Sequence, residues 1–132
     1  MKIQELRALL LEDDIFKAQD IKKALNNCGV RDILQAENQR KGLELLEEST
    51  SQGKPISLIV TDMSYPLDRG AAEDPDAGEK LVKYLQKENL DIPVILCSSI
   101  NYKDPMFAGC VWYNKKLRDI DQEFREILAE LK

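Results

Sequence analysis

The sequence of 132 residues contains no histidine and only three cysteines. Without histidine, the chain cannot build a Ser–His–Asp triad, a Cys–His nucleophile pair or a zinc site of the Cys/His type. Cys28, Cys97 and Cys110 are odd in number and scattered along the chain, as is usual in a reducing compartment, so we expect a cytoplasmic protein. Any chemistry must therefore use carboxylates, hydroxyls and lysines.

Long apolar runs and a surplus of basic residues are also missing. No segment approaches the roughly 20 apolar residues that cross a bilayer, and the charges at Glu5 and Arg7 argue against a signal peptide. The 24 acidic and 19 basic residues give a net charge of −5. Negative charge is repelled by phosphate backbones and anionic lipids, so we expect this chain alone to bind neither nucleic acid nor membranes.

The length and composition instead indicate a single globular domain over residues 1–132. Hydrophobic residues make up 43% and charged residues 33%, the balance of an ordinary soluble protein. A chain of this length buries roughly two-thirds of its unfolded surface, which is enough for a real core. There is no repeat, linker or low-complexity segment.

Short apolar segments alternate with segments of helical periodicity along the chain. The apolar segments predict five strands, at 8–11, 32–36, 56–60, 94–97 and 111–113. The periodic segments predict helices at 15–28, 38–48, 78–89 and 120–131, and residues 101–108 leave room only for a shortened fourth helix. This alternation predicts an α/β fold, a five-stranded parallel sheet with helices on both faces. Helices reach both faces only if the strand order reverses once, near the first strand, as in the order 2-1-3-4-5.

Acids and a hydroxyl stand where three of these strands end. Glu12 and Asp13 follow the first strand, Asp62 follows the third and Ser98 follows the fourth. Sheets of this type bind ligands at the carboxyl ends of their strands, so we expect these side chains to share one pocket. Converging carboxylates need a counter-ion, and oxygen ligands suit Mg²⁺. An Asp carboxylate can also attack phosphorus and form an aspartyl phosphate, with a metal and a lysine stabilising the transferred charge.

The same residues also have a purely structural interpretation. Acids and serines at strand ends often cap the following helix, so Asp14 could cap the first helix and Ser98 the fourth. Their occurrence together, on the expected strands and in the expected order, favours the functional interpretation.

Four segments, in this order, resemble the receiver domain of two-component response regulators, in its stand-alone, chemotaxis-regulator-like form. These segments are Leu-Leu-Glu-Asp-Asp at 10–14, Leu-Ile-Val-Thr-Asp-Met-Ser-Tyr-Pro at 58–66, Pro-Val-Ile-Leu-Cys-Ser-Ser at 93–99 and Asn-Lys at 114–115. The resemblance spans nearly the whole chain and implies a flavodoxin-like fold. It also implies Asp62 as the phospho-acceptor, with the following site residues: Glu12, Asp13, Asp62 and the Ser64 backbone carbonyl for Mg²⁺, Ser98 and Lys115 for the phosphoryl group, and Ser98 with Trp112 as the switch.

The resemblance further implies a function in a phosphorelay. The chain would accept a phosphoryl group from a sensor histidine kinase or a phosphotransfer protein and signal to a downstream protein that the sequence does not identify. It would catalyse its own phosphorylation and dephosphorylation without being a conventional enzyme.

Several departures from the family pattern keep alternatives open. Lys116 stands where the family has a cis proline, so Lys115 and Lys116 compete as the phosphate lysine, and Tyr113 replaces Trp112 as the switch aromatic if Lys116 is used. The acidic loop at 67–77 is longer than in the family and is expected to be solvated, unless it covers the acceptor or selects a partner. The main alternative is a pseudo-receiver, an interaction module that works without phosphorylation and binds Mg²⁺ poorly.

Two alternatives with other chemistry fit less well. A flavodoxin-like cofactor binder needs a hydroxyl- and glycine-rich phosphate loop after the first strand, where this chain has three acids. A haloacid-dehalogenase-like phosphatase would have a second Asp two residues after Asp62, where Ser64 stands.

Overall fold

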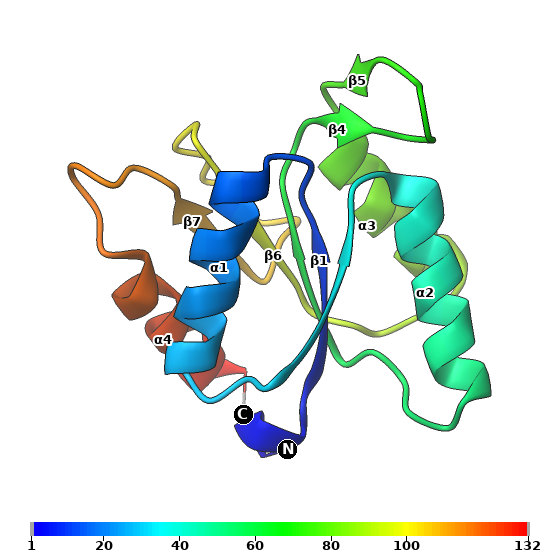
Figure 1. Cartoon of the computed structure of the whole chain (residues 1–132), viewed down its shortest axis with the longest axis horizontal. Helices are drawn as coiled ribbons and strands as arrows, with labels where there is room; N and C mark the ends of the chain where they lie inside the picture. The colour runs from blue at the N-terminus through cyan, green and yellow to red at the C-terminus, as the bar shows by residue number, and fades with distance from the viewer. Residues whose placement is uncertain (1, 132) are drawn as a thin grey trace.

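The computed structural model of the chain describes residues 2–131, which form a parallel sheet between two layers of helices (Figure 1). The strands of this sheet are β1 (Arg7–Leu11), β2 (Asp32–Ala36), β3 (Leu58–Thr61), β6 (Val94–Ser98) and β7 (Gly109–Trp112). The α-helices are α1 (Ile15–Asn27), α2 (Gln39–Ser51), α3 (Ala77–Lys87) and α4 (Ile120–Glu130), and a 3-10 helix, η1 (Ile3–Glu5), precedes β1.

The strand order is β2-β1-β3-β6-β7, and every neighbouring pair is parallel. This confirms the predicted five-stranded flavodoxin-like sheet with order 2-1-3-4-5. The order reverses at β1, which lies between β2 and β3. Leu11, the last residue of β1, is paired with Thr61, the last residue of β3, so the acids that follow these strands are neighbours.

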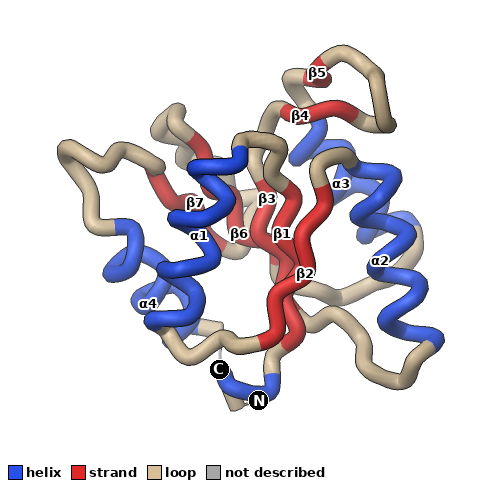
Figure 2. Tube along the Cα trace, viewed as in Figure 1, coloured by secondary structure: helices blue, strands red, loops and turns tan. Residues whose placement is uncertain are grey.

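The two faces of the sheet bury two separate apolar clusters. Helices α1 and α4 cover one face, and α2 and α3 cover the other (Figure 2). Along β1, Ala8 and Leu10 pack in the first cluster and Leu9 and Leu11 in the second, because successive side chains of a strand point to opposite faces. Burial on both faces is the physical reason why the strands are apolar without alternation.

Polar side chains cap three of the helices at their first turn. Asp14 accepts hydrogen bonds from the backbone N–H groups of Phe16 at 2.9 Å and Lys17 at 3.0 Å, Asn38 caps α2 and Asp119 caps α4. The capping role considered for Asp14 is therefore confirmed. Ser98 caps no helix, because no helix follows β6 before β7.

Two connections differ from what the sequence predicts. The segment between β3 and α3, expected to contain no regular element, forms a small antiparallel hairpin from β4 (Tyr65–Pro66) and β5 (Glu73–Asp74). The segment between β6 and β7, expected to hold a shortened helix, contains only turns and irregular backbone (Figure 2). Two-residue strands have no measurable periodicity, and Pro105 with Gly109 leaves too few residues for a helix.

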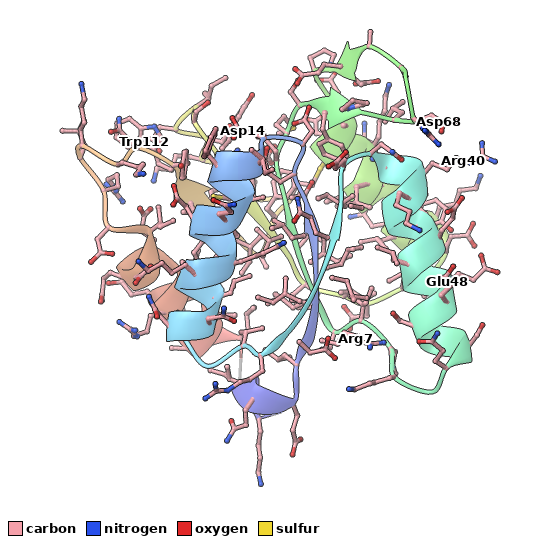
Figure 3. All side chains as sticks on the ribbon, viewed as in Figure 1. Arg7, Asp14, Arg40, Glu48, Asp68 and Trp112 are labelled. Atoms are coloured by element: carbon pink, nitrogen blue, oxygen red, sulfur yellow. The ribbon has the colours of Figure 1, made fainter. Side chains whose placement is uncertain are left out.

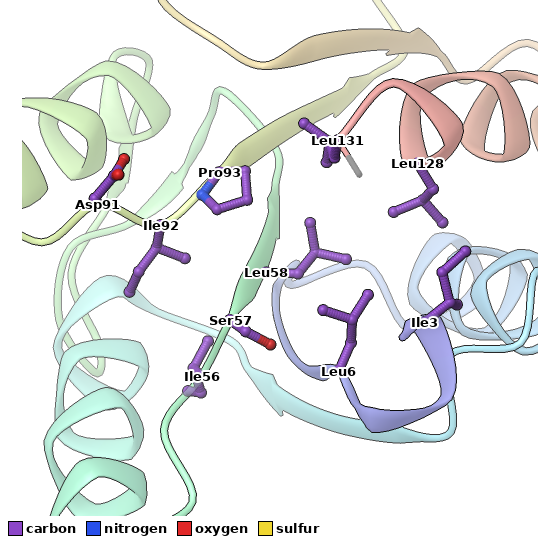
Figure 4. A pocket seen from close by; sticks show the side chains of 10 residues that line it. All are labelled: Ile3, Leu6, Ile56, Ser57, Leu58, Asp91, Ile92, Pro93, Leu128 and Leu131. Carbon is purple, nitrogen blue, oxygen red and sulfur yellow. The ribbon is translucent and has the colours of Figure 1, made fainter. Parts of the chain in front are cut away.

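The two ends of the sheet have different characters. At the amino ends of β1, β3 and β6, an apolar pocket of about 300 Å³ lies near both chain termini (Figures 1 and 4). Among residues 2–131, Asp91 is the one charged side chain that lines this pocket, so these residues do not provide the convergent polar groups of a catalytic site. None of the helices within residues 2–131 is long and apolar enough to cross a membrane.

Candidate functional site

An acidic pocket of about 320 Å³ lies at the opposite end of the sheet, at the carboxyl ends of β1, β3 and β6. In Figure 3 the labelled Asp14, at the start of α1, marks this end of the molecule. The pocket is lined by Glu12, Asp13, Asp14, Lys17, Asp62, Met63, Ser64, Glu73, Ser98, Ser99, Ile100, Tyr102 and Tyr113. The structure therefore brings together the strand-end acids and the hydroxyl predicted from sequence, and it adds Lys17 and Glu73.

Glu12 lies at the bottom of the pocket, with only 1% of its side chain exposed. Its Oε2 accepts a hydrogen bond from the Asp14 backbone N–H at 3.1 Å. Its Oε1 lies 2.9 Å from the Nζ of Lys17 but accepts no hydrogen bond of normal geometry from residues 2–131. Burial raises the pKa of Glu12, although the charge of Lys17 counteracts this shift.

Asp62 follows β3 and is held by backbone contacts on two sides. Its N–H donates to the carbonyl of Leu11 at 3.1 Å, and its Oδ1 accepts from the N–H of Met63 at 2.7 Å. Its Oδ2 lies 3.0 Å from the Nζ of Lys17, and 18% of the side chain is exposed. The carboxylate is thus fixed in orientation and still reachable from solvent.

Lys17 is a functional candidate that the sequence interpretation missed. It lies on α1, its side chain is 7% exposed, and its ammonium bridges Glu12 and Asp62. Burial alone would lower the pKa of Lys17, but the negative charges of Asp62 and Glu12 outweigh burial and raise it, so the group is an ammonium ion. A signal was available: Lys17, Ile21 and Ala24 follow helical spacing, which places the lysine on the buried face of α1.

Asp13 and Glu73 lie on the open side of the pocket. Partial burial raises the pKa of Asp13, and a hydrogen bond and the negative charge of Glu73 raise it further. Glu73, in β5, also accepts a hydrogen bond from the hydroxyl of Ser64 at 3.1 Å. The loop at 67–77 is therefore not only a solvated connection, because it places a fifth acid, Glu73, at the pocket. No spacing in the sequence could have revealed this contact.

Ser98, the last residue of β6, is almost fully buried beside the acids. Its Oγ accepts a hydrogen bond from the N–H of Ile100 at 3.1 Å. Its carbonyl accepts from the N–H of Tyr113 at 2.7 Å and so ties the end of β6 to the residue that follows β7. This hydroxyl lies where the sequence predicts it.

Lys115, which the resemblance implies for the phosphoryl group, lies outside this pocket, and Trp112 does not line it either. The ammonium of Lys115 lies 3.4 Å from Asp20 on α1, and 71% of the side chain is exposed. The indole N–H of Trp112 donates to the carbonyl of Ser99 at 3.1 Å. Strand β7 ends at Trp112, one residue earlier than predicted, and the residue of this segment that lines the pocket is Tyr113.

The oxygen atoms on the open side have the chemistry of a Mg²⁺ site. Asp13, Asp62 and Ser64 line the same pocket, and no hydrogen bond to the Ser64 carbonyl oxygen comes from residues 2–131. Over those residues, no group of three or more His, Cys, Asp or Glu side chains could hold a metal ion by itself. Mg²⁺ usually takes one or two carboxylates and keeps several waters, so two carboxylates and a free carbonyl fit it. Glu12 is instead engaged with Lys17.

Comparisons with known proteins show the fold. No family model matches the sequence, and no curated protein matches it. A CheY-like response regulator receiver domain from Methylobacillus flagellatus superposes with a TM-score of 0.68 at 17% identity, over 96% of this chain and 98% of that chain. The phosphorylated cyanobacterial phytochrome response regulator RcpA gives 0.68 at 19% identity, over 92% and 90%. The Mn²⁺-bound form of response regulator Rcp1 gives 0.67 at 17% identity, over 94% and 92%. The chain therefore has the receiver-domain fold along nearly its whole length.

Proposed function

We propose that this chain is a phospho-acceptor receiver domain and that Asp62 is its acceptor. One observation carries the proposal: at the switch point of a receiver fold, Asp62 shares a pocket with Glu12, Asp13 and Ser98. The phosphorylated state of RcpA, which has the same fold, supports it. The exposed fraction of Asp62, 18%, leaves the carboxylate accessible to a donor.

The phosphoryl donor in this proposal is a phosphohistidine of a sensor kinase or phosphotransfer protein. A carboxylate oxygen of Asp62 attacks phosphorus, an O–P bond forms and the N–P bond breaks. The electron pair of the N–P bond goes to the imidazole nitrogen, which takes up a proton. In the later dephosphorylation, water attacks phosphorus, the bond between phosphorus and the Asp62 oxygen breaks, and inorganic phosphate leaves the regenerated carboxylate.

Mg²⁺ is the cofactor we propose for this transfer, held by Asp13, Asp62 and the carbonyl of Ser64. When bound, it supplies positive charge to the oxygens of the phosphoryl group. The Mn²⁺-bound form of Rcp1 supports a divalent cation on this fold. Ser98 would donate its hydroxyl hydrogen to a phosphoryl oxygen, because it lies in the same pocket and no described carbonyl or carboxylate accepts from it.

The output of the domain would be a conformational signal to another protein. If the Ser98 hydroxyl moves toward the phosphoryl group, the hydrogen bond from the Tyr113 N–H to the Ser98 carbonyl transmits the change to the end of β7 and to Trp112. We propose a protein partner in the cytoplasm, and no nucleic acid or membrane contact by this chain alone, because its net charge is −5.

A pseudo-receiver is the second candidate, and a specific contact favours it. The acceptor carboxylate is already paired with Lys17 at 3.0 Å, so the pocket is partly neutralised without any metal or phosphoryl group. In that function the ion pairs would only stabilise an interaction surface.

Intact-mass analysis separates the two candidates. The chain is incubated with Mg²⁺ and acetyl phosphate, beside an Asp62→Asn variant and a sample with excess chelator. The phospho-acceptor function predicts one added phosphoryl group in the parent and none in either control. No addition to the parent, together with no detectable Mg²⁺ binding, would establish the pseudo-receiver instead.

A further inference from the structure

The first turn of α1 places Lys17 next to the acids that follow β1. Asp14 caps the helix and accepts a hydrogen bond from the Lys17 backbone N–H at 3.0 Å. The backbone N–H of Asp14 in turn donates to the side-chain carboxylate of Glu12 at 3.1 Å. The segment 12–17 is therefore closed on itself, and the lysine backbone cannot move independently of the acidic segment.

The Lys17 ammonium lies between two carboxylates at contact distance. Its Nζ is 2.9 Å from Oε1 of Glu12 and 3.0 Å from Oδ2 of Asp62, and the three side chains are 7%, 1% and 18% exposed. Charges this deeply buried persist only when they are paired. Asp62 is the most exposed of the three, so the ammonium approaches the reacting carboxylate from the interior while solvent reaches it from outside.

The end of β7 supplies an aromatic ring to this region and no cation. The ring centroid of Tyr113 lies 5.7 Å from the Nζ of Lys17. The Tyr113 hydroxyl donates to Asp20, and the ammonium of Lys115 also lies beside Asp20, at 3.4 Å. Asp20, on α1, therefore keeps Lys115 on the surface, and Tyr113 takes up the space nearest the pocket.

We propose that Lys17 is the lysine that binds the phosphoryl group on Asp62, a role that rests on the function proposed above. A phosphoryl group attached to Asp62 would place its oxygens next to the ammonium that already touches Oδ2, without a large movement of the lysine. Negative charge on these oxygens grows during transfer, and a fixed cation there stabilises it. Lys17 lies on α1 and is a catalytic residue in this proposal, because its ammonium contacts an oxygen of the reacting Asp62 carboxylate.

The same position makes Lys17 a competitor of the metal. The ammonium offsets one of the two negative charges of Glu12 and Asp62, and Asp62 is also a ligand of the proposed Mg²⁺. Positive charge next to a metal ligand weakens the binding of a dication. Removal of the lysine charge should therefore strengthen Mg²⁺ binding while it impairs phosphorylation, a combination that a purely structural lysine would not produce.

The test compares Lys17→Met with Lys115→Met, the rival lysine, and with Lys23→Met, an exposed position on the same helix. Mg²⁺ affinity is measured by titration calorimetry without phosphodonor, and phosphorylation by acetyl phosphate is followed by intact mass. For Lys17→Met we expect phosphorylation at least about 100-fold slower, with Mg²⁺ bound several-fold more tightly. For Lys115→Met and Lys23→Met we expect rates within about twofold of the parent.

A double variant covers the case in which Lys17→Met leaves Glu12 unpaired and fails to fold. Glu12→Gln with Lys17→Met replaces the buried ion pair by neutral side chains of similar size, and it should fold and remain poorly phosphorylated. Normal phosphorylation of this double variant, or loss of phosphorylation in Lys115→Met alone, would overturn the assignment. If the parent itself takes up no phosphoryl group, the proposed phospho-acceptor function is wrong. In that case, equal Mg²⁺ affinities of the parent and Lys17→Met would also overturn the proposal that Lys17 competes with the metal.

Discussion

Ser98 and Ser99 are adjacent hydroxyls at the same pocket with different surroundings. Ser98 is 4% exposed and lies beside the acids at the end of β6, whereas Ser99 is exposed and its carbonyl is held by the indole N–H of Trp112. This difference allows one serine to control for the other.

Ser98→Ala should slow phosphorylation by roughly 100-fold, the loss typical of removing one donor to a developing negative charge. Ser99→Ala should leave the rate within about twofold. Both are measured by the time course of intact mass with Mg²⁺ and acetyl phosphate, after circular dichroism has shown normal folding. Equal rates for the two variants would remove Ser98 from the site.

At the scale of residues, the sequence predicts those groups whose place depends on a strand end. Glu12 and Asp62 each follow an apolar strand directly and Ser98 is the last residue of one, so the topology alone brings them together. The helical spacing of Lys17 with Ile21 and Ala24 places it on the buried face of α1, but this spacing does not show that its long side chain reaches Glu12 and Asp62. Glu73 reaches the pocket through the closure of a hairpin, which no spacing reveals. The role of Lys115 is implied by the resemblance of Asn114-Lys115 to the family's fifth-strand end, and the sequence does not reveal that Asp20 on α1 lies beside this lysine, at 3.4 Å.

At the scale of elements, the first turn of α3 lies unusually close to the backbone of Asp62 and Met63, which follow β3. The N–H of Gly78 donates to the carbonyl of Met63 at 2.9 Å. A Cβ atom at Gly78 would lie 2.7 Å from the carbonyl oxygen of Asp62 and 3.1 Å from the Cα of Met63. Both contacts are with backbone atoms, so relief requires the acceptor segment or the helix to move.

Gly78→Ala should therefore lower the free energy of unfolding by about 1–2 kcal/mol, because overpacking against backbone outweighs the better helix propensity of alanine. Displacement of Asp62 should also slow its phosphorylation. Lys83→Ala, at an exposed position of α3, provides the control and should change stability by less than about 0.5 kcal/mol. Urea unfolding at pH 7 measures the stability of both variants. A Gly78→Ala variant as stable as the parent would show that the backbone of Asp62 and Met63 leaves more space beside residue 78 than the structure indicates.

The elements predicted correctly are those with several residues of clear periodicity. The five strands of the sheet, β1, β2, β3, β6 and β7, and helices α1 to α4 agree with the predictions to within a few residues at each end. The hairpin of β4 and β5 could not be predicted, because each of its strands has two residues and the connection depends on tertiary contacts of Tyr65 and Glu73. The absence of a helix between β6 and β7 is only partly predictable, because a short segment limits the length of a helix but still allows one helical turn.

At the scale of the whole molecule, one group of ion pairs links β1 to the edge strand β2, at the end of the sheet opposite the pocket. Arg7 on β1 donates to Asp32 on β2 at 2.9 Å, and Lys54 lies 3.3 Å from the same oxygen of Asp32. Figure 3 shows Arg7 near the end of the sheet opposite Asp14. Partial burial raises the pKa of Asp32, but the hydrogen bonds and charges of Arg7 and Lys54 outweigh burial and hold it below its ordinary value.

A lowered pKa of Asp32 in the folded state makes its contribution to stability depend on pH. The contribution is complete above the unfolded pKa of about 4 and is lost as the pH falls through the lower folded pKa. Asp32→Asn should destabilise the protein by about 1 kcal/mol at pH 7, a value limited by solvent screening, and the difference from the parent should shrink below about pH 4. Urea unfolding of the parent and the variant, at pH 7 and again below about pH 4, tests this. Asp91→Asn, which removes an exposed acid without an ion pair in the described residues, is the control and should leave the free energy of unfolding at pH 7 within about 0.5 kcal/mol of the parent.

The most direct test of the whole account is the position of the phosphoryl group. After incubation with Mg²⁺ and acetyl phosphate, borohydride reduces an aspartyl phosphate to homoserine, and peptide mass mapping locates the changed residue. The account predicts homoserine at position 62 in the parent, none in a sample without phosphodonor, and little in Lys17→Met. Homoserine at Asp13 or at an acid of the 67–77 loop, with Asp62 unmodified, would contradict it.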